Sequence, residues 1–263
     1  MADATANVVE VFSSIQGEGP WVGASTLFVR LGGCDLRCRW CDSPGTWKPA
    51  REARFERVAG HGFEQGDAEL ATNPVPLEVL VAAAERLGLA SHRWVSLTGG
   101  EPLLQPDALG AVAEALGGRG PGLFLETHGL HAEALEGVVD RLQFVSMDWK
   151  LASDVWRRNE SADEATPFHG AHEAFLEVAR RAPHTSVKVV VTPASTDEEL
   201  DEVFVRVARG PPAAGLVLQP VTPTGGVHRA PSAVRMQELA QRAGQRLQDV
   251  RVIPQTHPLL GVA

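Results

Sequence analysis

All three cysteines of this 263-residue chain lie within one short segment, as Cys34, Cys38 and Cys41 in the spacing C-x3-C-x2-C. Structural zinc is normally closed by four protein ligands, and a [4Fe–4S] cluster is normally held by four thiolates. A loop that supplies three thiolates leaves one iron without a protein ligand, and that iron can bind a substrate or cofactor. The spacing therefore predicts a catalytic cluster. A zinc knuckle completed by His128 or His257 is the alternative.

The composition is that of an ordinary globular protein, with 44% hydrophobic and 22% charged residues. A formal net charge of −9 disfavours charge-driven nucleic-acid binding, which needs a basic surface. No run of about 18 apolar residues is present, so we expect no membrane span. The N-terminal residues lack the pattern of a signal peptide, and three closely spaced cysteines do not form a disulfide framework. We therefore expect a reducing, cytoplasmic setting.

Apolar segments alternate with stretches of helical periodicity along most of the chain. This rhythm predicts an α/β fold with a mostly parallel sheet, as in a full or partial β/α barrel. We expect one domain over residues 1–263, with a polar loop or small insertion at about 46–73 and an irregular stretch at 152–166. The expected strands are Asn7–Phe12, Thr26–Leu31, Trp94–Leu97, Leu123–Glu126, Phe144–Asp148, Ser186–Val191, Leu216–Gln219 and Val250–Ile253. The expected helices are Pro76–Leu87, Pro106–Leu116, His131–Val139, Ala171–Arg181, Glu198–Arg209 and Ser232–Arg246.

The sequence Thr98-Gly99-Gly100-Glu101-Pro102 follows directly after an expected strand. Two glycines at a strand end let the backbone approach a ligand closely. Their amides and carbonyls can bind the ammonium and carboxylate groups of an amino acid, and Glu101 can accept a hydrogen bond from the ammonium. A tight turn before the next helix is the alternative. Ligands of parallel sheets bind at the carboxyl ends of the strands, so both motifs belong at the same edge.

The cysteine loop followed by a strand that ends in T-G-G-E-P resembles the radical S-adenosylmethionine (SAM) superfamily. The resemblance implies a partial, open β/α barrel. It also implies a [4Fe–4S] cluster whose open iron chelates the amine and carboxylate of SAM, and a 5′-deoxyadenosyl radical produced by electron transfer. Gly99, Gly100 and Glu101 would hold the methionyl amine. The radical abstracts hydrogen, so no side chain is expected to act as a catalytic acid or base.

Longer segments resemble the 7-carboxy-7-deazaguanine synthase family. They are the opening segment 10–19, the loop 33–43 with the preceding strand, and the shorter segments 125–129, 218–221 and 251–257. The resemblance implies a lyase that converts 6-carboxy-5,6,7,8-tetrahydropterin to 7-carboxy-7-deazaguanine with loss of ammonia, on the route to queuosine in tRNA. SAM would act as a regenerated cofactor, and Mg²⁺ would be needed.

The resemblance also implies cofactor contacts. Trp40 lies between two cysteines, where its ring can cover a bound cofactor. The segment Ser146-Met147-Asp148-Trp149-Lys150 differs from the S-P-K sequence of many family members, and Asp148 and Lys150 would bind the ribose and carboxylate of SAM. The same departure is similar to glycyl-radical-enzyme activases, which remain an alternative. The full cofactor set is Trp40, Cys41, Asp42, Gly99, Gly100, Glu101, Ser146, Asp148, Lys150 and Gln219.

Arg30 is expected to bind the substrate carboxylate bidentately, and Gln16 to read the polar edge of the pterin together with the neighbouring backbone. Ser43 matches the hydroxyl ligand of Mg²⁺, although many family members have threonine there. Lys188 can point either into the barrel mouth or outwards. The full set of substrate contacts is Ile15, Gln16, Gly17, Glu18, Arg30, Thr98, Glu126, Thr127 and His257.

The expected partners are the small pterin substrate, a flavodoxin-type electron donor and a second copy of the chain in a homodimer. The donor and the homodimer rest on the resemblance. Outside radical chemistry, a metal-binding module without turnover is the remaining alternative.

Overall fold

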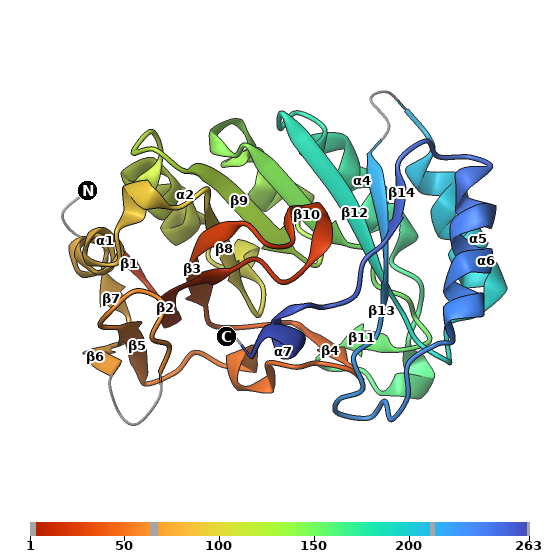
Figure 1. The fold of residues 1–263 in the computed structure, drawn as a ribbon, viewed down its shortest axis with the longest axis horizontal. Coiled ribbons are helices and arrows are strands. Elements are labelled where there is room, and N and C mark those ends of the chain that lie inside the picture. The colour runs from red at the N-terminus through yellow and green to blue at the C-terminus, as the bar shows by residue number, and fades with distance from the viewer. Residues whose placement is uncertain (1–3, 64–67, 211–213, 262–263) are drawn as a thin grey trace.

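The computed structural model describes residues 4–63, 68–210 and 214–261. In the described residues the main sheet has ten strands in the order β14-β13-β12-β10-β9-β8-β3-β2-β5-β6 (Figure 1). From β3 to β14 every neighbouring pair is parallel, whereas β2 runs antiparallel to β3. The strands are β2 (Val8–Ile15), β3 (Ser25–Leu31), β5 (Glu52–Glu56), β6 (Ala68–Thr72), β8 (Trp94–Gly99), β9 (Gly122–Thr127), β10 (Phe144–Asp148), β12 (His184–Val191), β13 (Gly215–Pro220) and β14 (Val250–Val252).

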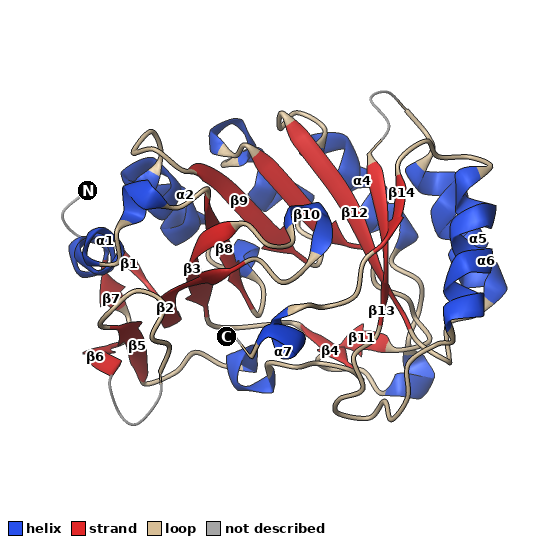
Figure 2. Ribbon diagram, in the orientation of Figure 1, coloured by secondary structure: helices blue, strands red, loops and turns tan. Residues whose placement is uncertain are grey.

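The longer helices lie on the outer side of the curved sheet, whereas the short C-terminal helix lies in front of it, near the mouth (Figure 2). The expected helix Pro106–Leu116 has the observed bounds of α2, because a proline occupies its first turn and Gly117 follows its last residue. The other expected helices occur with ends shifted by a few residues, and α3 is the shortest of them. The helices are α1 (Leu77–Arg86), α2 (Pro106–Leu116), α3 (Ala132–Glu136), α4 (His169–Ala179), α5 (Asp197–Val207), α6 (Ala233–Gly244) and α7 (His257–Leu260).

The sheet is an open β/α barrel, as predicted, because β14 and β6 stand at opposite ends of the strand order. The strands are buried on both faces: β12 is buried from Ser186 to Val191, and every residue of β8 from Trp94 to Thr98 is buried. Such strands contain nearly continuous apolar runs. Apolar side chains of the sheet and of the helices form one large core between them.

Four aromatic rings close the amino end of the barrel. Trp94 and Phe144 begin β8 and β10, and their rings pack with Phe124 of β9 and with Trp21. Trp21 comes from the segment after β2, which lies across β9 and β10 in Figure 1. Ring centroids are 4.8 Å apart for Trp21 and Trp94, and 4.7 Å apart for Phe124 and Phe144. This plug leaves the carboxyl end of the strands as the open mouth.

The segment at 46–73 extends the sheet instead of forming an irregular insertion. Strands β5 and β6 pair antiparallel, and β5 continues the main sheet beside β2. Ala53 and Phe55 of β5 are buried, whereas Glu52 and Arg54 between them are exposed. Residues 64–67 of this segment lie outside the described residues. The two-residue strands β1 (Thr5–Ala6) and β7 (Val75–Pro76) pair separately.

The expected irregular stretch 152–166 contains a short strand. This strand, β11 (Val155–Arg157), pairs antiparallel with β4 (Leu36–Cys38) inside the cysteine motif. The backbone N–H of Arg39 also donates to the carbonyl of Asp154, at 2.9 Å. The stretch therefore serves as the support against which the cysteine loop is held.

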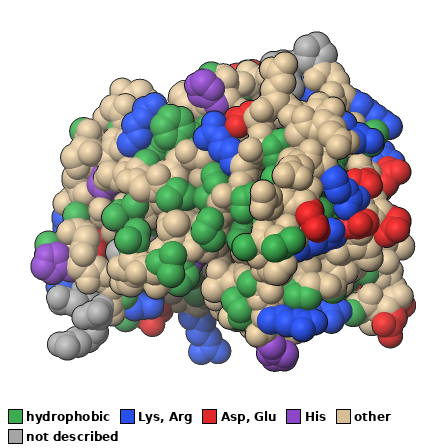
Figure 3. Space-filling model, turned by 45° about the vertical axis from the view of Figure 1, so that its right-hand side comes forward, with side chains coloured by type: hydrophobic (Ala, Val, Ile, Leu, Met, Phe, Trp, Pro, Cys, Tyr) green, Lys and Arg blue, Asp and Glu red, His purple; other side chains and the backbone are tan. Residues whose placement is uncertain are grey.

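Acidic and basic side chains are interspersed at the right-hand side of the face in Figure 3. On the outer helices, Arg242 of α6 pairs with Asp197 and Asp201 of α5 at 2.8 and 2.6 Å. Exposed pairs of this kind contribute little to stability individually. Among the described residues, every helix is too short or too polar to cross a membrane.

Candidate active site

The carboxyl ends of the parallel strands surround a cavity of about 330 Å³. Its wall contains the last residues of several strands, among them Thr98, Thr127, Asp148 and Gln219. The segment after β2 and the C-terminal segment near His257 complete the wall. The parallel topology thus gathers side chains that are far apart in the sequence at one mouth.

Cys34, Cys38 and Cys41 all line this cavity, and all three are free thiols of intermediate exposure. The loop leaves β3, turns at Gly33 and returns as β4. Burial raises the pKa of Cys34 to about 11 and that of Cys38 to about 12. A thiolate at these positions therefore needs a compensating cation, and a bound metal centre would provide it.

The spread of the three sulfurs disfavours a single zinc ion. Two thiolates on one zinc, each about 2.3 Å from it, can be at most about 4.6 Å apart. Among the described residues, three metal-ligating atoms within 4.8 Å of one another occur only at Asp35, His128 and His131, so the three cysteine sulfurs are not that close. The ring nitrogens of His128 face Asp35 and Glu101, at 2.8 and 3.3 Å. The predicted alternative of a zinc knuckle that joins the three cysteine thiolates to His128 is thus disfavoured, because these ligand atoms do not lie within 4.8 Å of one another in the described residues.

The glycines after β8 lie directly against the cysteine loop. A Cβ atom on Gly100 would collide with the carbonyl oxygen of Gly33 and lie 2.9 Å from the Cβ of Cys34. A Cβ on Gly99 would collide with the backbone of Leu31, and Gly99 has a φ of +147°. The two glycines are therefore needed for this close approach.

Glu101 is the one predicted site residue that the structure does not bring to the cavity wall. Its side chain is fully buried and accepts hydrogen bonds from the backbone N–H groups of Leu103 and His128, at 3.0 and 2.8 Å. The hydroxyl of Thr127 donates to it as well, at 2.8 Å. Its carboxylate thus ties the turn after β8 to the end of β9.

A chain of buried charges crosses the cavity. Lys188 pairs with Glu18 and lies 3.2 Å from Asp148 Oδ1, and Lys150 Nζ lies 2.7 Å from Asp148 Oδ2. Burial alone would raise the pKa of Asp148, but the two lysines hold it below its ordinary value. Lys150 Nζ also lies 4.5 Å from the centroid of the Trp40 ring. The side chain of Lys188 thus points into the mouth, which the sequence left open.

A second polar group surrounds Glu126 at the end of β9. Gln16 Nε2 and Ser96 Oγ donate to Glu126 Oε1, at 3.0 and 2.5 Å. Burial is the largest influence on Glu126 and raises its pKa, although both hydrogen bonds oppose the shift. The side-chain oxygen of Gln16 accepts from the backbone N–H of Glu18 at 3.0 Å, so one amide joins the Glu126 carboxylate to the backbone of the segment after β2.

Arg30 lines the cavity from the end of β3 and makes an ion pair at the same time. Its Nε lies 2.8 Å from Glu10 Oε1, and its guanidinium lies 5.6 Å from the Phe12 ring centroid. Phe12 is stacked on Phe28, with ring centroids 4.9 Å apart. The cation is therefore held beside a flat apolar wall.

The C-terminal segment closes one side of the cavity. The backbone N–H of Thr256 donates to the carbonyl of Gly17 at 2.9 Å. Gln255 Nε2 donates to Glu18 and to Asp42, at 2.5 and 2.9 Å. His257 also lines the cavity, on the same segment. This segment therefore joins the loop after β2 to the cysteine motif.

Residues 28–207 match the family model of the radical SAM superfamily. The 7-carboxy-7-deazaguanine synthase of Geobacter sulfurreducens is 37% identical over 99% of both chains, and that of Methanopyrus kandleri is 35% identical over 97% of this chain and 93% of the relative. The chain belongs to the 7-carboxy-7-deazaguanine synthase family. It is therefore a radical SAM enzyme, and the activase and the turnover-free binding module are not favoured.

Solved structures support the fold of this synthase family member. The crystal structure of QueE from Escherichia coli matches with a TM-score of 0.59 and 23% identity, over 95% of this chain and 93% of that one. A radical SAM methyltransferase from Sphaerobacter thermophilus matches with a TM-score of 0.55 and 16% identity, over 88% and 66% of the chains. Both similarities concern the fold.

The synthase cavity includes every predicted cofactor, substrate and metal residue except Glu101. Prediction from the sequence missed other residues of the wall, and two of them, Phe12 and Phe28, lie within expected strands. The missed wall residues are Phe12, Phe28, Leu36, Thr46, Trp47 and Gln255.

Proposed function

We propose that this chain converts 6-carboxy-5,6,7,8-tetrahydropterin to 7-carboxy-7-deazaguanine with loss of ammonia, as a radical SAM lyase. The observation that carries the proposal is the common cavity. Its wall contains the cysteine loop and the glycines of β8 together with Gln16, Arg30 and Glu126. A cavity of about 330 Å³ with a few convergent polar groups suits a small ligand.

The cysteine loop is proposed to hold a [4Fe–4S] cluster, and the match of residues 28–207 to the radical SAM superfamily and the position of all three cysteines on one cavity wall support this choice. When bound, the cluster and SAM supply a carbon radical that abstracts hydrogen from the substrate. Gly99 and Gly100 present backbone groups to the methionyl end. Glu101 is proposed to position these glycines, since its carboxylate is occupied by protein donors.

Further contacts are proposed for the rest of SAM. Asp148 accepts from the ribose hydroxyls, and Lys150 binds the carboxylate while the Trp40 ring covers the cofactor. Gln219 is 2% exposed, lines the cavity, and its Oε1 has no hydrogen-bond partner within the described structure. An unpaired buried acceptor is costly, and a ligand donor would satisfy it. Ser146 and the backbone near Cys41 and Asp42 complete this side.

At the other end, Glu126 is proposed to accept from the amino group and ring N–H of the pterin. Ser96 and Gln16 hold its carboxyl group in place, and Gln16 also fixes the turn at Ile15, Gly17 and Glu18. Thr98, Thr127 and His257 border the same space. Substrate recognition is thus proposed to depend on carboxylates that the protein orients before binding.

The substrate carboxylate is proposed to bind the guanidinium of Arg30. The ion pair with Glu10 uses Nε, so the proposal assigns the terminal Nη groups to the substrate. Mg²⁺ is proposed to take the hydroxyl of Ser43 together with substrate and water oxygens, because Mg²⁺ prefers oxygen ligands and keeps several waters.

A flavodoxin-type protein is proposed as the electron donor. Arg39 of the cysteine loop and Arg157 of β11 are 42% and 47% exposed, and each also pairs with a neighbouring carboxylate, of Asp154 and Glu160. This local charge suits an acidic partner although the chain has a net charge of −9. The homodimer is proposed from the family resemblance.

The proposal is tested by anaerobic incubation of the reconstituted protein with SAM, reductant, Mg²⁺ and the carboxytetrahydropterin, followed by mass analysis. We expect carboxydeazaguanine and ammonia as products. The amount of SAM consumed should be smaller than the amount of product formed, because SAM is regenerated. The Cys38→Ala variant serves as the control without a cluster and should form no product. Cleavage of SAM without carboxydeazaguanine would contradict the proposed substrate.

A further inference from the structure

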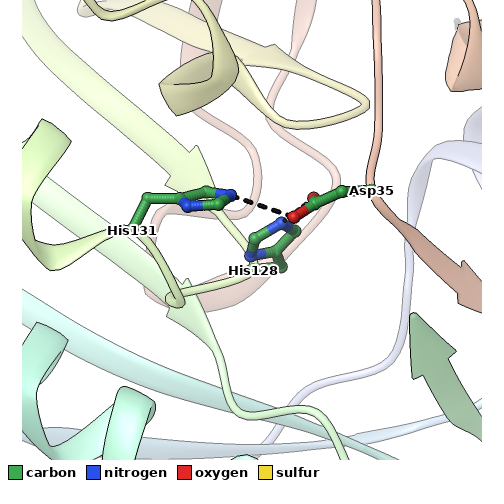
Figure 4. A group of neighbouring side chains, drawn as sticks. All are labelled: Asp35, His128 and His131. Atoms are coloured by element: carbon green, nitrogen blue, oxygen red, sulfur yellow. Dashed lines mark hydrogen bonds and ion pairs between the residues drawn. The ribbon is translucent and has the colours of Figure 1, made fainter. Parts of the chain in front are cut away.

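We infer that Asp35, His128 and His131 form a second metal site, which binds one divalent transition-metal ion such as Zn²⁺. Figure 4 shows the three side chains converging. Asp35 directly follows Cys34, His128 follows β9, and His131 precedes α3. The site is distinct from the three thiols, and the inference goes beyond the proposed reaction.

The separations between the ligand atoms suit a single ion. His128 Nε2 lies 2.8 Å from Asp35 Oδ1, and His131 Nε2 lies 3.2 Å from Asp35 Oδ2. All three ligand atoms lie within 4.8 Å of one another. Tetrahedral ligands about 2.0–2.2 Å from zinc are separated by roughly 3.3–3.6 Å. The distance between His131 and Asp35 is near this value, whereas the 2.8 Å contact between His128 and Asp35 is a hydrogen bond that a bound ion would replace, with a small movement of the ring.

The orientation of His131 favours a shared ion over a simple hydrogen bond. Its Nε2 is buried and lies close to Asp35 Oδ2, yet it has no hydrogen-bond partner within the described structure. A ring N–H that served this carboxylate would point at the oxygen. His128 Nε2 does hydrogen-bond Asp35 Oδ1 at 2.8 Å, so Asp35 holds one ring and leaves Nε2 of the other ring unpaired and available to a metal.

The surroundings of His128 resemble those of metal-binding histidines in proteins. His128 is almost fully buried, and its other ring nitrogen, Nδ1, lies 3.3 Å from Glu101 Oε2. A metal-bound histidine usually has an outer carboxylate near its second nitrogen, and Glu101 lies at that side of the ring, although His128 Nδ1 makes no hydrogen bond in the described structure. The side chains of Asp35 and His131 are 36% and 29% exposed, so a water can take the remaining position.

The donor set decides the class of ion. Two imidazoles and one carboxylate suit Zn²⁺ or Fe²⁺, whereas Mg²⁺ takes oxygen ligands. A bound ion would join the first residue after Cys34 to the end of β9. The site would thus stabilise the cysteine loop from the side opposite β11.

The experiment uses the anaerobically reconstituted holoprotein, dialysed against buffered Zn²⁺. Zinc, iron and sulfide per chain are then measured, and X-ray absorption gives the zinc ligands. We expect one zinc per chain in addition to the cluster iron, with nitrogen or oxygen neighbours at about 2.0–2.1 Å. In His131→Gln, zinc affinity should fall by at least the roughly 10–100-fold that loss of an outer partner costs, with iron and sulfide unchanged.

Asp35→Asn is the second variant, because it keeps the size of the side chain and removes the anionic ligand. It should lose zinc affinity as His131→Gln does. His61→Gln, at an exposed histidine outside the site, is the matched control and should bind zinc as the wild type does. Zinc–sulfur neighbours at about 2.3 Å, no bound zinc, or equal affinity in His131→Gln would each overturn the inference.

Discussion

Lys188 Nζ on β12 directly contacts the carboxylate of Glu18, although the two residues are 170 positions apart. The same amino group lies 3.2 Å from Asp148 Oδ1. One buried cation thus holds a residue of the proposed substrate loop and a residue of the proposed SAM contact. Burial alone would lower the pKa of Lys188, but these carboxylates raise it above its ordinary value.

Lys188→Met should destabilise the protein and weaken substrate binding. Removing one partner of a buried ion pair typically costs about 3–5 kcal/mol, because the other charge remains buried and unpaired. The double variant Glu18→Gln/Lys188→Met should recover part of the lost stability, although not the substrate affinity. Urea unfolding midpoints of all the variants measure the coupling. Additive effects of the two substitutions on the free energy of unfolding would contradict an interaction between Glu18 and Lys188.

Glu126→Gln should change the pH dependence of stability. The folded-state pKa of Glu126 is raised above its ordinary value of 4.5, so its ionisation is less favourable in the folded than in the unfolded protein. The wild type should therefore lose stability relative to the variant as pH rises from 4.5 through the raised pKa. Unfolding midpoints over this range measure the difference. If the unfolding midpoints of wild type and variant change with pH in parallel, the pKa of Glu126 is not raised in the folded protein.

Gly100→Ala should prevent the cysteine loop from retaining its cluster. The added Cβ would collide with the carbonyl of Gly33 and crowd Cys34, so the loop and β8 must separate. Iron and sulfide per chain after desalting measure the loss. Gly110→Ala in α2 is the matched control, since its Cβ would meet nothing within 4 Å. It should leave the iron content unchanged and add up to about 1 kcal/mol of stability. Equal iron in both variants would contradict the steric argument.

Arg30→Ala should raise the KM for the pterin and leave the cluster in place. A hydrogen bond between charged groups contributes about 1.5–3 kcal/mol, which corresponds to a roughly 10–150-fold change. Steady-state kinetics with iron analysis measure both effects. Arg119→Ala, which removes an arginine whose side chain is 44% exposed and pairs with Glu85, is the control. An unchanged KM in Arg30→Ala would remove Arg30 from the proposed substrate site.

Ser43→Ala should weaken the response to Mg²⁺, because the proposed hydroxyl ligand is lost. Titration of activity with Mg²⁺ should give a midpoint several-fold higher than in the wild type, with the same iron content. Ser43→Thr keeps the oxygen and should restore the wild-type midpoint. Superimposable titrations for Ser43→Ala and wild type would exclude this residue as a ligand.

Most of this fold can be predicted from the sequence, because helix boundaries and apolar runs in the sequence coincide with the elements that the chain forms. Helix α2 follows from its proline and glycine boundaries, and the strands from their apolar runs. The hairpin β5–β6 was missed because its alternation of buried and exposed residues covers only Ala53, Phe55 and their neighbours. The orientation of Lys188 could not be predicted, because a strand buried on both faces lacks a period of two.

The predicted site depended on short motifs with fixed spacing, and the cavity brings those motifs together. Asp35, His128 and His131 were not predicted as a group. No spacing rule joins Asp35 to residues more than 90 positions later, and only the adjacency of β3, β8 and β9 brings them together. For Glu101 the motif was recognised, but the direction of the side chain could not be predicted from it. The structure shows that the carboxylate is not part of the cavity wall.

The hydrogen bond from Thr256 to Gly17 has a consequence for biosynthesis, because it spans 239 residues. Proteins are made from the amino end, and early segments fold before late ones. The three cysteines therefore leave the ribosome long before the C-terminal segment that closes one side of the cavity. The nascent polypeptide passes through a stage in which the cysteine loop is present and the contact between Thr256 and Gly17 has not yet formed.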